Sequence, residues 1–313
     1  MKTTILLVLT LIPFILNSCS NGGASQNKDS EYILVKKNGR IIKAYNAFRD
    51  FLNSDKSWAS YKKILLDAYP EVKAVHKTQL NWGSIDSAKF PEEVTKYKKE
   101  DWEKYFSLYD DRKLNTLYDS VIELENKILK PVENKPVDLC LFLPYGSCFI
   151  ITGPKVNTIY ISLLIDTADV KKIMVHEYAH NLHSQRHTEE PFNLGREVVS
   201  EGIAVYLTTL TIKDIGIYRA IPFMPEASVR WCYDNEKAIR DSISKDLADT
   251  TFNGMKKYIS DGSFATPPRG FVEKTAYFTG YRIIEACIRK GFSIDKICSM
   301  NSKDIIRESR YFE

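Results

Sequence analysis

The chain has 313 residues, of which 44% are apolar and 27% are charged, and this ordinary globular composition excludes a largely disordered, collagen-like or coiled-coil protein. Its 44 basic and 40 acidic residues leave a net charge of +4. No run of five or more basic residues occurs, so we expect no nucleic-acid partner.

The first eighteen residues predict a lipoprotein signal peptide. Lys2 precedes an apolar stretch from Ile5 to Leu16, which is much shorter than the roughly 20 apolar residues of a membrane-spanning helix. Leu16-Asn17-Ser18-Cys19 resembles a bacterial lipobox, in which cleavage before Cys19 leaves that cysteine as the lipidated first residue. We therefore expect an exported protein that is anchored to a bacterial membrane through Cys19, because several acyl chains on one residue give stable attachment. The alternative is a plain secreted protein that is cleaved nearby.

Residues 19–30 are polar and predict a flexible tether between the lipid and the folded body. Ser20 directly follows the cysteine and favours sorting to the outer membrane.

Five cysteines remain after this segment, and none forms a C-x-x-C pair, which argues against a zinc ribbon or a redox motif. Cys140 and Cys148 flank a turn signal and are one possible disulfide pair. Cys287 and Cys298 are another possible pair. Burial as small apolar side chains is the alternative for both pairs, and it also suits the fifth cysteine, Cys232.

The hydrophobic pattern predicts an α+β protein that is mainly helical. Residues 31–136 form an N-terminal helical region, with apolar residues at helical spacing over 45–52, 61–69 and 114–128. Three short runs rich in β-branched and aromatic residues then predict a small central sheet, at 137–143, 148–152 and 158–164. Residues 167–313 are helical again, and the predicted helices cover 167–185, 193–211, 225–247, 271–290, 293–300 and 302–309.

The first helix after the sheet carries the sequence His176-Glu177-Tyr178-Ala179-His180, an H-E-x-x-H motif. Residues four apart lie on one helix face, so two imidazoles can reach one Zn²⁺ ion at about 2.0–2.1 Å each. Glu177 can then accept a proton from a water molecule on the metal, which makes it the candidate general base. His183 lies about 10.5 Å along the axis from His176, too far to share that metal.

The third ligand must therefore come from another segment. Glu201 lies 21 residues after His180, and this spacing resembles the gluzincin arrangement, in which a glutamate on the next long helix completes the site. Gly202 beside it predicts a close approach of these two helices. We expect one zinc ion per chain, held by His176, His180 and Glu201. The alternatives for the third ligand, which the spacing leaves open, are Glu197, Glu189, Glu190 and His187.

At these motifs the chain resembles the DUF2268 family of predicted zinc-dependent proteases, which belongs to the gluzincin group. The resemblance runs from Leu139 to the C-terminus and is carried by the segments 175–180, 200–204, 276–284, 291–294 and 305–309. It implies a zincin-like fold for residues 137–313. It also implies that the strand at 158–164 aligns an extended peptide, and that Tyr277 or Tyr281 donates to the oxyanion, with ordinary packing as the alternative for both tyrosines.

Two functions follow as expectations. The first is a zinc metallopeptidase that acts on peptides or proteins outside the cytoplasm. The alternative, from a related lipoprotein family that serves gliding motility, is a catalytically silent zincin-fold lipoprotein that binds partners in a cell-surface assembly. The intact Glu177 argues against the alternative, because a purely structural zinc site has no use for a base at that position.

Overall fold

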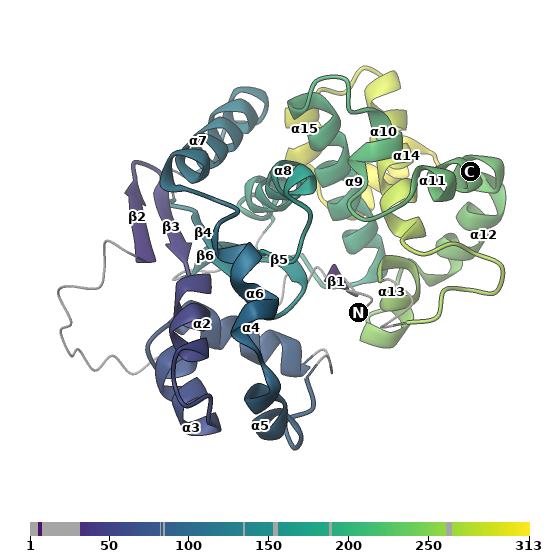
Figure 1. Ribbon diagram of the computed structural model, residues 1–313. Coiled ribbons are helices and arrows are strands. Elements are labelled where there is room, and N and C mark those ends of the chain that lie inside the picture. Colours follow the sequence, from purple (N-terminus) through teal and green to yellow (C-terminus); the bar gives the residue numbers. More distant parts are fainter. Residues whose placement is uncertain are drawn as a thin grey trace. The chain divides into compact units, whose positions relative to one another are not determined.

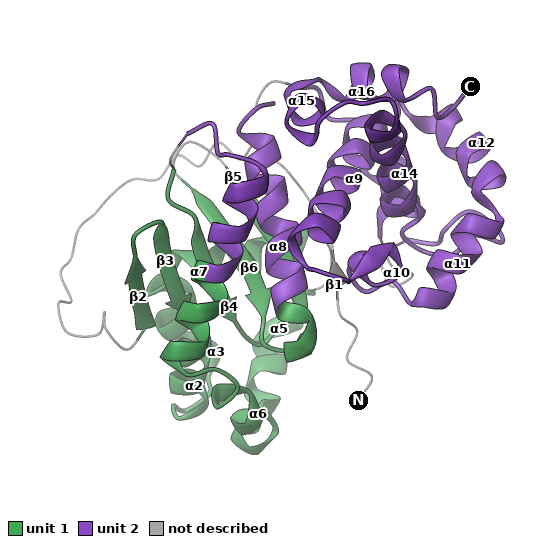
Figure 2. Ribbon diagram, turned by 90° about the horizontal axis from the view of Figure 1, so that it is seen from above, with its two compact units in different colours: residues 1–5, 10–119, 135–170 green, residues 6–9, 120–134, 171–313 purple. Residues whose placement is uncertain are grey.

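The computed structural model describes residues 6–7, 32–81, 83, 85–133, 135–152, 156–187, 190–260 and 265–313 (Figure 1). Apart from strand β1 (Leu6–Leu7), the predicted signal peptide, Cys19 and the tether lie outside these residues. The described residues divide into two compact units (Figure 2). Unit 1 contains residues 32–119 and 135–170, and unit 2 contains 120–134 and 171–313.

The sheet belongs to unit 1, where the strand order is β5-β6-β4-β3-β2. Its strands are β2 (Ile33–Lys36), β3 (Gly39–Lys43), β4 (Asp138–Phe142), β5 (Ser147–Thr152) and β6 (Asn157–Ser162). The pairs β3–β4 and β4–β6 are parallel, while β2–β3 and β5–β6 are antiparallel, so the sheet is mixed. The predicted α+β class is confirmed.

The sheet is larger than predicted, because β2 and β3 come from a stretch that we expected to be helical. The two strands form a hairpin, in which Lys36 pairs with Gly39. Gly39 has φ of 149°, and a Cβ atom on it would lie 2.1 Å from the Val137 carbonyl oxygen. Ile41 and Ile42 are buried in the sheet against β4, so their apolar run forms a central strand rather than a helix face.

Strand β6 has neighbours on both sides. Ile159 is paired with Leu139 of β4 and also with Ile150 of β5. Alignment of an extended peptide by strand addition needs a free edge, so the prediction that this strand aligns a substrate is wrong.

The same order of strands separates Cys140 from Cys148. Cys140 pairs with Tyr160, whereas Cys148 pairs with Ile161, because β6 lies between their strands. Cys287 and Cys298 are not joined either, and all five cysteines from Cys140 onward are free thiols in the core. Neither of the two possible disulfide pairs is formed. The alternative, burial of the thiols as small apolar side chains, is confirmed.

The remaining elements of unit 1 are short helices that surround an aromatic core. Phe48, Phe51 and Tyr61 are fully buried, and Phe51 meets Tyr61 edge to face at 5.2 Å between ring centroids. These elements are α2 (Tyr45–Leu52), α3 (Trp58–Tyr61), the π-helix η1 (Lys62–Asp67), α4 (Pro70–Asn81), α5 (Phe90–Glu93), the 3₁₀-helix η2 (Val94–Lys96) and α6 (Lys99–Phe106).

Two long helices, α7 (Asp111–Ile128) and α8 (Thr167–Ser184), contribute residues to both units. The other helices of unit 2 are α9 (Leu194–Thr211), α10 (Gly216–Ala220), α11 (Glu226–Asp234), α12 (Glu236–Asp246), α13 (Phe252–Ile259), α14 (Thr275–Arg289), α15 (Ile294–Ser299) and α16 (Ser302–Ser309). The helix predicted over 225–247 is thus two helices that meet at Asn235.

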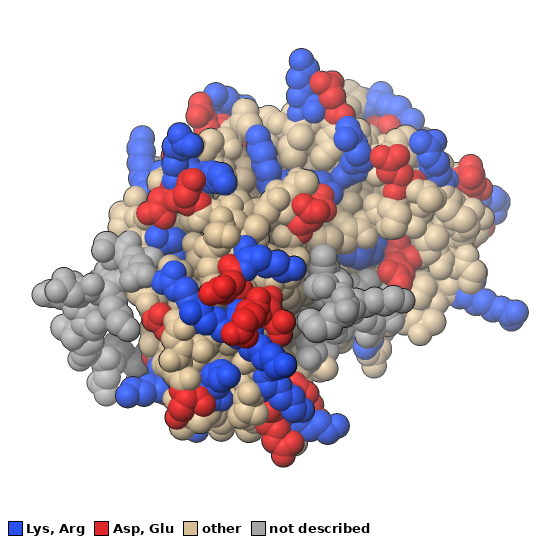
Figure 3. All heavy atoms as spheres, viewed as in Figure 1, with Lys and Arg blue, Asp and Glu red and all other residues tan. Residues whose placement is uncertain are grey.

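The helix starts in unit 2 follow from their capping residues. Asn193 accepts a hydrogen bond from the Arg196 amide and begins α9, and Asn301 accepts one from the Asp304 amide and begins α16. Among the described residues, no helix combines the length and the apolar character that crossing a bilayer requires. Basic and acidic side chains are interspersed on the face drawn in Figure 3.

Candidate metal centre

Helix α8 places the two histidines of the motif on one face. The ring centroids of His176 and His180 are 4.8 Å apart, and their Nε2 atoms are 3.2 Å apart. Both side chains are buried. Two imidazole nitrogens at this separation have to share a hydrogen atom or a cation, and the i, i+4 spacing on the helix produces that proximity directly.

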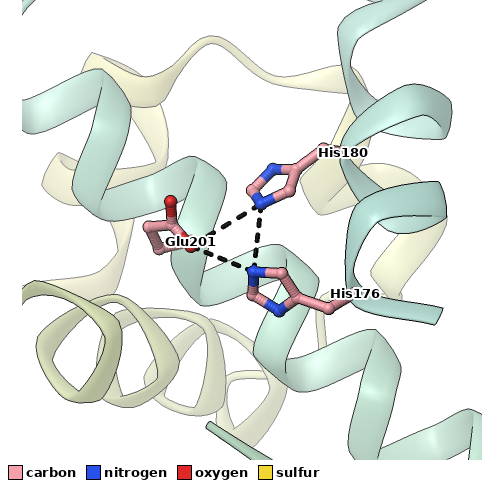
Figure 4. A group of neighbouring side chains, drawn as sticks. All are labelled: His176, His180 and Glu201. Carbon is pink, nitrogen blue, oxygen red and sulfur yellow. Dashed lines mark hydrogen bonds and ion pairs between the residues drawn. The ribbon is translucent and has the colours of Figure 1, made fainter. Parts of the chain in front are cut away.

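Glu201 of α9 completes the cluster (Figure 4). Its Oε2 atom lies 3.2 Å from His176 Nε2 and 3.6 Å from His180 Nε2. The three ligand atoms lie within 4.8 Å of one another. Across the part of the chain that the structure describes, no other group of three or more His, Cys, Asp or Glu side chains meets that geometry.

The alternative third ligands lie elsewhere. Glu197 is one turn before Glu201 on α9 and is buried, but it does not join the cluster. Glu190 accepts a hydrogen bond from the Ser302 amide through its Oε1 atom. His187 bonds through Nε2 to the Cys298 carbonyl oxygen at 2.8 Å. The remaining alternative, Glu189, lies outside the described residues.

The protonation states of the cluster suit a cation. Burial lowers the pKa of His176 to about 4 and that of His180 to about 3, so both imidazoles are neutral at pH 7 and keep a nitrogen lone pair. Burial raises the pKa of Glu201, and the neighbouring His176 opposes that rise. Two neutral imidazoles and one carboxylate, desolvated and facing one point, are a donor set that fits Zn²⁺.

Ser200 contacts one of the two histidines, and the sequence did not reveal this contact. Its Oγ atom lies 3.0 Å from His180 Nδ1, and both side chains are buried. If His180 Nδ1 carries the hydrogen and donates to Ser200, then Nε2 keeps its lone pair toward His176 and Glu201.

Helix α7 is hydrogen-bonded to both helices that carry the cluster, α8 and α9. Asn126 accepts a hydrogen bond from the Tyr178 hydroxyl of α8 at 2.8 Å, and Glu125 accepts one from the Thr211 hydroxyl of α9 at 3.1 Å. Burial raises the pKa of Glu125 well above its ordinary value. The two residues are adjacent, so a single turn of α7 is tied to both helices that carry the cluster.

Gly202 does not serve the contact that we predicted for it. A Cβ atom on Gly202 would lie 2.1 Å from the carbonyl carbon of Gly280, and one on Gly280 would lie 2.0 Å from the Val198 carbonyl oxygen. The close approach is therefore between α9 and α14, not between the two ligand helices. Helix α14 therefore packs directly on the backbone of α9, next to the residue that carries the Glu201 side chain.

This contact brings Tyr277 of α14 to the cluster. Its ring stacks on that of His176, with 5.9 Å between centroids and 19° between planes, and the side chain is fully buried. Burial raises the pKa of Glu201, and an interaction with the Tyr277 hydroxyl is one of the smaller effects that oppose this rise. Tyr281, the other tyrosine considered from sequence, packs against Tyr206 at 5.8 Å between centroids.

The comparisons with known proteins agree with this centre. A family model described as "Predicted Zn-dependent protease (DUF2268)" matches residues 152–307, and over these residues the chain belongs to this family. The matched range contains both ligand helices and Tyr277. Comparisons with curated proteins and with solved structures gave no match.

Proposed function

We propose that the protein is a zinc-dependent metallopeptidase with one zinc ion per chain, held by His176, His180 and Glu201. The observation that carries the proposal is the meeting of these three side chains in one buried cluster, on two helices that the family model spans. Bound Zn²⁺ supplies Lewis acidity toward a peptide carbonyl and lowers the pKa of a water molecule.

The chain's own residues then have separate tasks. Glu177 follows His176 on α8 and is fully buried, so its carboxylate acts in a site of low dielectric constant. It takes the proton of the attacking water and passes it to the leaving amine. Ser200 keeps His180 in the tautomer that a ligand needs, and the Tyr277 ring fixes the plane of His176.

The decisive experiment separates metal binding from hydrolysis. Purified, delipidated protein should contain one equivalent of zinc by elemental analysis and should cleave an unstructured protein such as casein. Glu177→Gln should keep the zinc and lose the hydrolysis, since Glu177 is a base and not a ligand. Loss of zinc in Glu177→Gln as complete as in His180→Ala would overturn the assignment of roles.

A zinc-loaded parent protein without hydrolysis of any unstructured substrate would instead support the second function, a silent zincin-fold lipoprotein in a surface assembly. The carboxylate in the H-E-x-x-H motif favours the enzyme, because a structural zinc site needs no base there.

We further propose that the protein acts in the cell envelope, attached to a bacterial membrane, most simply the outer membrane, through lipidated Cys19. The lipobox-like sequence and the polar segment after it support this location. Cys19→Ala should move the protein from the membrane fraction to the soluble fraction or block its processing. Unchanged fractionation with membranes would require a different anchor.

A further inference from the structure

Lys274 occupies an unusual position at the start of α14. Its backbone has φ of 60° and ψ of 29°, in the left-handed region that side chains with a Cβ atom rarely adopt. Only 2% of the residue is exposed. Both features are unfavourable for a lysine, because the backbone is strained and the ammonium group is removed from water. Features of this kind gather at functional sites.

The surroundings connect Lys274 with the candidate metal centre. The Nζ atom lies 5.2 Å from the ring centroid of Phe223 and 5.9 Å from that of Tyr277, and such contacts partly replace water around a cation. The Tyr277 amide donates to the Lys274 carbonyl oxygen at 3.1 Å, which fixes the turn that holds both residues. The Tyr277 ring is the one that stacks on His176. A single aromatic ring therefore contacts both the ammonium group and a ligand.

The positive charge of Lys274 is felt by two of the three ligands. Burial is the main cause of the lowered pKa of His176 and of the raised pKa of Glu201. The charge of Lys274 adds to the first shift and opposes the second. A fixed cation in a buried site has two opposite consequences for a bound divalent ion. It repels the ion and so weakens its binding. It also strengthens the electrostatic stabilisation of a substrate oxygen that gains negative charge during the reaction.

We propose that Lys274 is a positioning residue for the metal centre, whose buried ammonium group acts through Tyr277 and Glu201 to favour turnover at the expense of metal affinity. The inference rests on the proposed zinc site. It makes a prediction that a merely structural lysine does not, because removal of a structural residue weakens metal binding, whereas removal of an opposing charge strengthens it.

The test compares zinc affinity in Lys274→Met and Lys274→Arg, measured on the full chain by competition with a chelator of known affinity. Lys274→Met should bind Zn²⁺ more tightly, on the order of tenfold, because the repulsion is gone. Its kcat on an unstructured protein should fall roughly 10–100-fold, which is the usual loss when a residue that supports the metal ligands is replaced. Lys274→Arg keeps the charge and should bind Zn²⁺ like the parent.

Lys256→Met is the matched control. Lys256 also lies over an aromatic ring, 5.4 Å from the Phe252 centroid, but on α13 and beside a side chain that is 43% exposed. Its substitution should change neither zinc affinity nor kcat. If Lys274→Met does not fold, Lys274→Gln provides the same loss of charge with a polar side chain.

The outcomes separate this inference from the proposed function. A parent protein that binds no zinc would overturn both. A parent that binds zinc, with a charge-free variant that binds it equally or more weakly, would overturn the role of Lys274 and leave the zinc site intact. Tighter binding in Lys274→Arg as well would show that the charge is not the cause, and would also overturn the inference.

Discussion

Ser200 stands directly before the proposed ligand Glu201 in the sequence, yet its hydroxyl oxygen contacts a different ligand, His180, 3.0 Å from Nδ1. Helix α9 thus supplies one of the proposed ligands and, one residue earlier, a group that contacts another. Because both side chains leave the same turn, any rotation of α9 would disturb the carboxylate and the imidazole together. The centre depends on the packing of α9 as much as on the motif in α8.

Ser200→Ala should therefore lower zinc affinity by about 10–100-fold, since His180 loses the partner that fixes its ring and tautomer. Chelator competition measures this loss. Ser184→Ala is the matched control, because its hydroxyl bonds to the Asn181 carbonyl oxygen of its own helix. Equal zinc affinity in Ser200→Ala and the parent would show that the hydrogen bond does not orient the ligand.

Glu201→Ala should severely reduce zinc binding, because it removes both a bond to the metal and a compensating negative charge. Glu197→Ala, one turn away and outside the cluster, should cost no more than about 10–100-fold in affinity. Elemental analysis of both purified variants, together with His183→Ala and His187→Ala, measures the difference. Full occupancy in Glu201→Ala with metal lost from Glu197→Ala or His187→Ala would contradict the gluzincin-like ligand set.

Local patterns predicted much of this centre. The i, i+4 spacing of His176 and His180 needs only a helix, and the apolar sequence after Glu201 predicted a second buried helix that needs a partner for its carboxylate. The three strands from 137 to 164 were also visible as short β-branched runs, and the structure contains them with shifts of at most two residues at their ends.

Long-range pairing accounts for what the sequence did not reveal. The hairpin of β2 and β3 is tied to β4 by Arg40 and Asp138, which are 98 residues apart in the chain, and its short apolar runs are ambiguous by themselves. No sequence pattern around Lys274 predicts that it is buried, because its burial and its contacts with aromatic rings depend on how α14 packs. Gly202 was noticed, but only the fold identifies Gly280 as the backbone that it meets.

Glu197 should make the metal-free protein less stable as the pH rises. Burial first, and the charge of Glu201 second, raise the pKa of Glu197 to about 8, whereas the unfolded chain releases this proton near 4.5. The folded state therefore holds more protons between these values, and this group's contribution to stability is lost as the pH rises from about 4.5 to 8.

Glu197→Gln cannot titrate, so its free energy of unfolding relative to the parent should increase with pH, by up to about 1.4 kcal/mol per pH unit. Urea unfolding of chelator-treated protein at pH 5, 6.5 and 8 gives this difference. A difference that stays constant over the three pH values would mean that Glu197 is ionised throughout the range.

Gly280→Ala should disrupt the protein more than a single methyl group normally does. The added Cβ atom would lie 2.0 Å from the Val198 carbonyl oxygen and 2.6 Å from the Gly202 backbone nitrogen, and neither backbone atom can move without shifting α9. We expect a loss of about 3 kcal/mol or more in the free energy of unfolding, at the upper end for overpacked cores. Gly291→Ala, where nothing lies within 4 Å of the new atom but φ is 88°, should lose only about 1–2 kcal/mol from backbone strain.

Zinc affinity distinguishes the two variants further. A displaced α9 carries Ser200 and Glu201 away from the histidines, so Gly280→Ala should bind zinc weakly even below its unfolding temperature. Gly291→Ala should bind zinc like the parent. Parent-like zinc affinity in a folded Gly280→Ala protein would show that the ligands do not depend on the contact between α9 and α14.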